Sequence, residues 1–143
     1  MINKLFINIC LILFLFGCAP YAKGPLFSQI PNLQANKCVL FVYRKDTIYQ
    51  NTPMVKINEK LFVKLGKKGY SYAYMAPGIY KLTFDYGFLE APFIIELPIE
   101  EQKEIYLRLY DIGFHKSVTE VEKEKALEEL KEYRFEEQIN LEF

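Results

Sequence analysis

Alternation of apolar and polar side chains, with a period of two residues, is the feature that most restricts how this chain can fold. It is clearest at residues 79–86, where bulky apolar or aromatic side chains hold the even positions from Tyr80 to Tyr86 and polar ones hold the odd positions from Lys81 to Asp85. Successive side chains of a strand point to opposite faces of a sheet, so this pattern predicts a β-strand with one buried face.

Seven short segments with strand-like character lie between residues 38 and 109: 38–44, 54–58, 60–65, 70–75, 79–86, 93–97 and 105–109. Asn58-Glu59 is the expected hairpin turn between the second and third. The chain holds 11 Tyr and 12 Phe but no Trp, and aromatic residues are enriched in strands. Seven short strands at close intervals predict a mainly β fold, an antiparallel sandwich occupying residues 37–112.

The last part of the chain, residues 113–143, has a different character. Ser117-Val118-Thr119-Glu120 has the spacing of a helix capping box, and the residues from there to Gln138 are mostly strong helix formers. We therefore expect a C-terminal amphipathic helix, with its glutamates on a solvated face.

The first seventeen residues have the pattern of a processing signal. Lys4 precedes an apolar run of about a dozen residues, which is shorter than the roughly 20 needed to span a bilayer. Gly17 and Cys18 follow it directly. We expect residues 1–17 to be removed as a signal peptide.

Leu15-Phe16-Gly17-Cys18 resembles the lipobox of bacterial lipoproteins. The resemblance implies cleavage before Cys18, attachment of lipid to its thiol, and a membrane as the partner that this lipid binds. Phe16 departs from the usual pattern, in which a smaller residue stands there. Asp after the lipidated cysteine resembles an inner-membrane retention signal, so Ala19 favours the periplasmic side of the outer membrane. Residues 18–36, rich in Pro, Gly, Asn and Gln, are expected to be the lipidated terminus and a tether.

Residues 38–109 resemble a family of small bacterial lipoproteins whose domain has no assigned function. The resemblance rests on Val42-Tyr43-Arg44, the hairpin at 55–60, Gly69-Tyr70-Ser71-Tyr72, and Pro77-Gly78-Ile79-Tyr80. Asn58-Glu59 replaces the Gly that is usual in the family's hairpin turn. The family implies a prealbumin-like or immunoglobulin-like sandwich and brings no activity with it.

Residue types that carry catalysis or bind metal are scarce. After removal of Cys10 and lipidation of Cys18, only Cys38 remains as a thiol, and the only histidine is His115. An enzymatic interpretation would gain support only if these two proved adjacent and exposed. The 18 basic and 18 acidic residues balance, so nothing indicates nucleic-acid binding. We expect no enzyme, no cofactor and no metal.

Tyr70, Tyr72 and Tyr74 are the remaining candidates for a binding surface. If they line one outer face of a strand, they would form an aromatic platform for a glycan or a protein. The alternative is that their rings pack against the C-terminal helix or the second sheet. The sequence thus predicts a non-enzymatic envelope lipoprotein that binds a protein partner or supports an assembly, or else a module that binds peptidoglycan or a small ligand through this tyrosine face.

Overall fold

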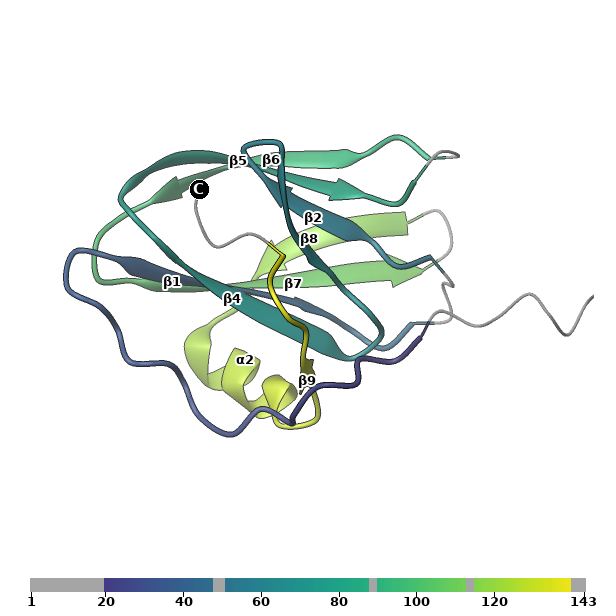
Figure 1. Ribbon diagram of the computed structural model, residues 1–143, viewed down its shortest axis with the longest axis horizontal. Coiled ribbons are helices and arrows are strands. Elements are labelled where there is room, and N and C mark those ends of the chain that lie inside the picture. Colours follow the sequence, from purple (N-terminus) through teal and green to yellow (C-terminus); the bar gives the residue numbers. More distant parts are fainter. Residues whose placement is uncertain (1–19, 48–50, 88–89, 113–114, 140–143) are drawn as a thin grey trace, which may run out of the picture.

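The computed structural model describes residues 20–47, 51–87, 90–112 and 115–139, and Figure 1 shows their arrangement. Over these residues the chain forms nine strands and one helix. The elements are β1 (Cys38–Arg44), β2 (Met54–Ile57), β3 (Lys60–Lys64), β4 (Gly69–Met75), β5 (Gly78–Asp85), β6 (Phe93–Ile99), β7 (Glu104–Ile112), β8 (His115–Glu120), α2 (Lys123–Leu130) and β9 (Arg134–Phe135). The mainly β prediction is confirmed, and each of the seven predicted segments contributes a strand.

The strands form two facing sheets, one ordered β8-β7-β1-β4-β9 and the other β3-β2-β5-β6. We had predicted an antiparallel sandwich, and this part of the prediction is wrong for two of the strand pairs. β1 pairs with β7 in parallel, and so does β4 with β9. Between β1 and β7 the chain crosses to the other sheet twice, forming β2 and β3, then β5 and β6, and it returns to the first sheet as β4 and finally as β7. That long connection allows β7 to enter in the same direction as β1.

The main core lies between the sheets and confirms the predicted inward face of β5. Tyr80, Leu82 and Phe84 are all buried there, each at most 9% exposed. β1 is buried along its whole length, because alternate residues face two different apolar clusters. This explains why its sequence is a continuous apolar run.

A second apolar cluster lies on the outer face of the five-stranded sheet, where α2 packs (Figure 1). Ala126 and Leu130 are the buried residues of the helix. The helix is much shorter than predicted, and the capping-box residues 117–120 belong to β8 instead. β8 forms a hairpin with β7, with His115 opposite Ile112. Ladder hydrogen bonds along this hairpin outweigh a local helix signal, whose individual contributions are small.

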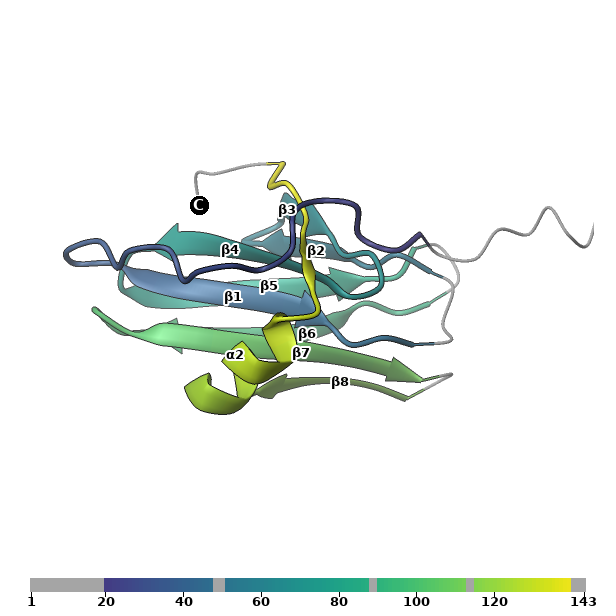
Figure 2. The same ribbon diagram turned by 90° about the horizontal axis from the view of Figure 1, so that it is seen from below.

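Residues 20–36, which we call the N-terminal segment, run along the same outer face and are not a free spacer (Figure 2). The Ala22 amide donates to the Lys67 carbonyl at 3.0 Å, and the Phe27 amide donates to the Tyr133 carbonyl at 2.9 Å. Phe27 and Ile30 pack against the second cluster. The described part of the expected tether is therefore part of the folded domain. Residues 18 and 19 lie outside the described residues.

The β2–β3 turn offers a test of local strain. Asn58 and Glu59 both have positive φ, 46° and 70°, as in the type I′ turn that favours Asn-Gly. We expect Glu59→Gly to raise the free energy of unfolding by about 0.5–1 kcal/mol, because glycine adopts this conformation without a Cβ clash. Urea denaturation is the measurement. Glu59→Ala is the control: it removes the exposed contact with Lys81 but keeps the strain, so it should give no gain.

Candidate functional site

The three candidate tyrosines lie on β4, on the outer face of the five-stranded sheet, but their platform is mostly covered. The Tyr70 ring is 5.4 Å from that of Phe27 and 5.6 Å from that of Phe135, between centroids. Burial raises the pKa of Tyr70. The rings that cover Tyr70 come from the N-terminal segment and β9, and Tyr70 also belongs to the same apolar cluster as Ala126 and Leu130 of α2, so the expected packing against the C-terminal helix is found in part.

Part of the tyrosine face remains accessible as a small pocket of about 230 Å³, the Tyr pocket. Its lining residues are Pro25, Leu26, Ser28, Gln29, Pro31, Tyr70, Tyr72 and Phe135. Tyr74 is not among them, because its hydroxyl donates to the Asn32 carbonyl at 2.9 Å. The structure thus divides the predicted trio into two pocket residues and one that fastens the N-terminal segment.

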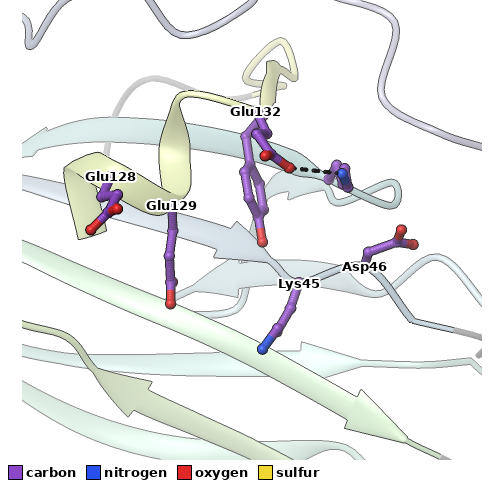
Figure 3. Close-up of a pocket in the computed structure, with 7 residues that line it drawn as sticks. Lys45, Asp46, Glu128, Glu129 and Glu132 are labelled. Atoms are coloured by element: carbon purple, nitrogen blue, oxygen red, sulfur yellow. Dashed lines mark hydrogen bonds and ion pairs between the residues drawn. The ribbon is translucent and has the colours of Figure 1, made fainter. Parts of the chain in front are cut away.

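A larger cleft of about 470 Å³ lies beside α2 (Figure 3). It is lined by Lys45, Asp46, Lys68, Glu128, Glu129, Glu132 and Tyr133. Lys45 and Asp46 follow β1, and Lys68 lies in the β3–β4 turn. The other four residues belong to α2 or follow it directly. Sequence reasoning missed this site, because no local pattern brings segments so far apart to one place.

Three charged side chains of this cleft, Lys68, Glu129 and Glu132, are paired within the protein. Lys68 Nζ lies 3.0 Å from Glu132 Oε2, and this contact raises the pKa of Lys68. Glu129 accepts hydrogen bonds from the Tyr43 hydroxyl at 2.8 Å and from Arg108 at 2.6 Å. Paired side chains of this kind present a fixed polar surface to a partner and dock α2 on the sheet; they are poor proton donors or acceptors for catalysis.

A buried ion pair stands at the same end of the sheet. Arg44, at the end of β1, donates to Asp111 on β7 through Nη2 at 2.8 Å and through Nε at 3.1 Å, and both side chains are fully buried. Arg44 Nη1 also donates to the Leu65 carbonyl at 3.2 Å, and Thr47 donates to the Asp111 carbonyl. The pair therefore ties two neighbouring strands of the sheet, β1 and β7, to the chain segment after β3. Because these hydrogen bonds are made within the protein, we assign the pair a structural role.

Cys38 and His115 do not form a catalytic pair. Cys38 begins β1, and β7 runs parallel to β1 from Glu104, beside Val39, to Ile112, which pairs with His115. The two residues thus lie at opposite ends of the sheet, on the order of 25 Å apart by strand rise. Cys38 is 0% exposed at the start of β1.

We expect the Cys38 thiol to resist modification in the folded protein. Burial raises its pKa to about 11, so at pH 8 only about one thiol in a thousand is the reactive thiolate. A chain starting at Ala19, in which Cys38 is the single cysteine, should react with a thiol reagent such as Ellman's at pH 8 only when urea is added. Rapid reaction of the native chain would contradict the buried placement.

Cys18 lies outside the described residues, so its predicted lipidation stays a prediction. Within the residues that the structure describes, no three or more His, Cys, Asp or Glu side chains are grouped to hold a metal ion. The same residues include no helix of the length and apolar character needed to cross a membrane. Comparison with known proteins found no matching family model, no similar curated protein and no similar solved structure.

Proposed function

We propose that this chain is a bacterial envelope lipoprotein, anchored by lipid on Cys18 at the periplasmic side of the outer membrane, whose sandwich is a non-enzymatic protein-binding module. The observation that carries the proposal is the order of Lys4, a short apolar run, Gly17 and Cys18. Two acyl chains would suffice for stable attachment, since each buried CH₂ contributes about 0.8 kcal/mol.

The surface that best suits a protein partner is the outer face of the four-stranded sheet. The opposite outer face is covered by α2 and the N-terminal segment, whereas on this one Ile79 is 75% exposed and Ile94 is 49% exposed. Ile79 lies opposite Pro98, and Ile94 lies opposite Thr83. Lys81 and its partner Glu96 lie between these two pairs, so the exposed apolar side chains of β5 and β6 form two spots with a charged pair between them. A mixture of apolar and polar contacts is typical of protein interfaces.

The anchor is tested by metabolic labelling with a palmitate analogue. The native chain should take up label and sediment with membranes, and Cys18→Ala should do neither. Cys10→Ala is the matched control, because Cys10 would leave with the signal peptide, and it should behave as the native chain. Labelling of Cys18→Ala at the native level would refute the anchor.

The binding face is tested by a photo-crosslinking amino acid placed at Ile79 or Ile94 in cells. Both positions should yield the same crosslinked protein. The control position is Leu33, which is 41% exposed but lies on the N-terminal segment. A product at Leu33 and none at the two β-sheet positions would rule out this face.

The Tyr pocket supports a second candidate, a glycan- or ligand-binding module, because Tyr70 and Tyr72 both line it. Aromatic rings and hydroxyls together suit sugars or small ligands. Tyr72→Leu keeps an apolar side chain in the cluster but removes the ring and hydroxyl, and it should weaken retention on peptidoglycan. Tyr110→Leu, at a half-buried tyrosine of β7 that does not line the pocket, should not. Equal retention of both variants would exclude this candidate.

A further inference from the structure

The folded domain begins almost at the anchor. Pro20 accepts a hydrogen bond from the Lys67 amide at 3.2 Å, and Tyr21 forms an isolated parallel bridge with Lys67. Only one residue, Ala19, separates Cys18 from Pro20. Two peptide units span at most about 7 Å, so a lipidated Cys18 could not hold the domain far from the bilayer.

This attachment point fixes which end of the sandwich would face the lipid. Lys67 lies in the turn between β3 and β4, next to the end of β1, because Tyr43 pairs with Tyr70. β7 ends on the same side, since it runs parallel to β1. Five residues at this end line a shallow hollow of about 470 Å³: Tyr21, Asp46, Thr47, Lys67 and Ile112. We call them the end surface.

The side chains of the end surface have the character of a membrane interface. Tyr21 is 54% exposed and Ile112 is 42% exposed, so both present apolar surface to the solvent at this end. The Tyr21 hydroxyl donates to Asp46 at 3.3 Å, and the Lys67 ammonium lies 5.7 Å from the Tyr21 ring centroid. Tyrosine is enriched at the boundary between headgroups and acyl chains, because its ring is apolar and its hydroxyl is polar.

We propose that the end surface rests on the lipid bilayer in which Cys18 is anchored. The strands would then run away from the membrane, with Gly78, at the start of β5, at the distant end of the sandwich. Both signs of charge occur on the end surface, with Lys67 beside Asp46. The contact therefore depends on the short connection and on Tyr21 and Ile112, and not on attraction to anionic lipid. This inference rests on the proposed lipid anchor.

The absence of Trp from the sequence gives a clean test. A single tryptophan is introduced as Ile112→Trp or, as a second reporter, Tyr21→Trp, in the full chain carrying its lipid. The matched control is Ile79→Trp, because Ile79 is exposed and lies at the end of β5 that is far from the end surface. The other end of β5 is the near one, since Asp85 there pairs with Met54, which begins the strand that follows β1. Each protein is reconstituted in phosphatidylcholine vesicles with or without lipid brominated near the top of its acyl chains.

The brominated lipid should quench the Ile112→Trp and Tyr21→Trp variants by about twofold or more, as expected of an indole at the boundary, and leave Ile79→Trp nearly unchanged. Flotation of the vesicles is measured in parallel. A protein that floats but shows no more quenching in Ile112→Trp and Tyr21→Trp than in Ile79→Trp overturns this inference and leaves the anchor standing. A protein that does not float and carries no lipid overturns the anchor, and the inference with it.

Discussion

Replacing Arg44 with methionine is expected to lower the free energy of unfolding by about 3–5 kcal/mol, because it leaves the Asp111 carboxylate buried without its cation. The remaining donors do not replace a bidentate guanidinium. Urea denaturation at pH 7 is the measurement. Lys81→Met is the control, since Lys81 makes only an exposed contact with Glu59, and its effect should stay within about 1 kcal/mol.

The deficit of Arg44→Met should shrink as the pH falls. Burial already raises the pKa of Asp111 in the native protein, and the Arg44 hydrogen bond opposes that rise. Without Arg44 the folded-state pKa moves further above the unfolded value of about 3.9. The folded variant then binds a proton more readily than the unfolded chain, so its stability relative to the native protein increases as the pH falls from neutrality towards that unfolded value. A deficit that grows on acidification would contradict this sign.

A double replacement distinguishes a lost pair from a lost shape. Arg44→Met with Asp111→Leu removes both charges, and apolar substitutes of similar volume often restore the stability of a buried pair. We expect the double variant to recover most of the loss. The Leu65 carbonyl then lacks its donor from Arg44, which limits the recovery by about 1 kcal/mol. A double variant as unstable as the single one would show that the guanidinium's shape, and not its charge, is what the fold needs.

The sequence predicted the strands well, because their signals are local. The alternation at β5 and the continuous apolar run of β1 each report how many faces of one strand are buried. Neither depends on which strand lies alongside. The hairpin turn at Asn58-Glu59 was likewise found from two adjacent residues.

The features that failed are those that depend on distant partners. β8 was taken for the start of a helix, because the capping-box spacing is visible in the sequence and the pairing with β7 is not. The parallel entry of β7 beside β1 cannot be deduced from either strand. Arg44 and Asp111 are 67 residues apart, and no residue near either one indicates that the two side chains would pair.

The prediction that the N-terminal segment is a tether failed for the same reason, and this failure affects the candidate site. Its Pro, Gly and Gln content is that of a spacer, yet Phe27 and Ile30 cover the second apolar cluster. The sequence could not show that this cluster existed, because it is assembled from β1, β4, β7 and α2. Coverage of the tyrosine face followed from that assembly, and only the Tyr pocket remained accessible.

Gly24 is the residue on which the seating of this segment depends most. A Cβ added at Gly24 would lie 2.0 Å from the Phe135 carbonyl oxygen, which is backbone and cannot rotate away. The same neighbourhood holds two hydrogen bonds, from the Phe135 amide to the Pro25 carbonyl at 2.8 Å and from Arg134 to the Gly24 carbonyl at 3.0 Å. A shift of the segment that relieves the clash would lengthen these hydrogen bonds.

We therefore expect Gly24→Ala to lower the free energy of unfolding by about 1–3 kcal/mol, the range found when a well-packed site is overfilled. Hydrogen exchange should speed up at the Ala22, Phe27 and Phe135 amides and stay slow in β5, because the segment leaves the sheet while the main core persists. Lys23→Ala, at the exposed neighbouring position, should change stability by less than about 0.5 kcal/mol. Equal stability and exchange in the two variants would mean that the segment is not clamped at Gly24.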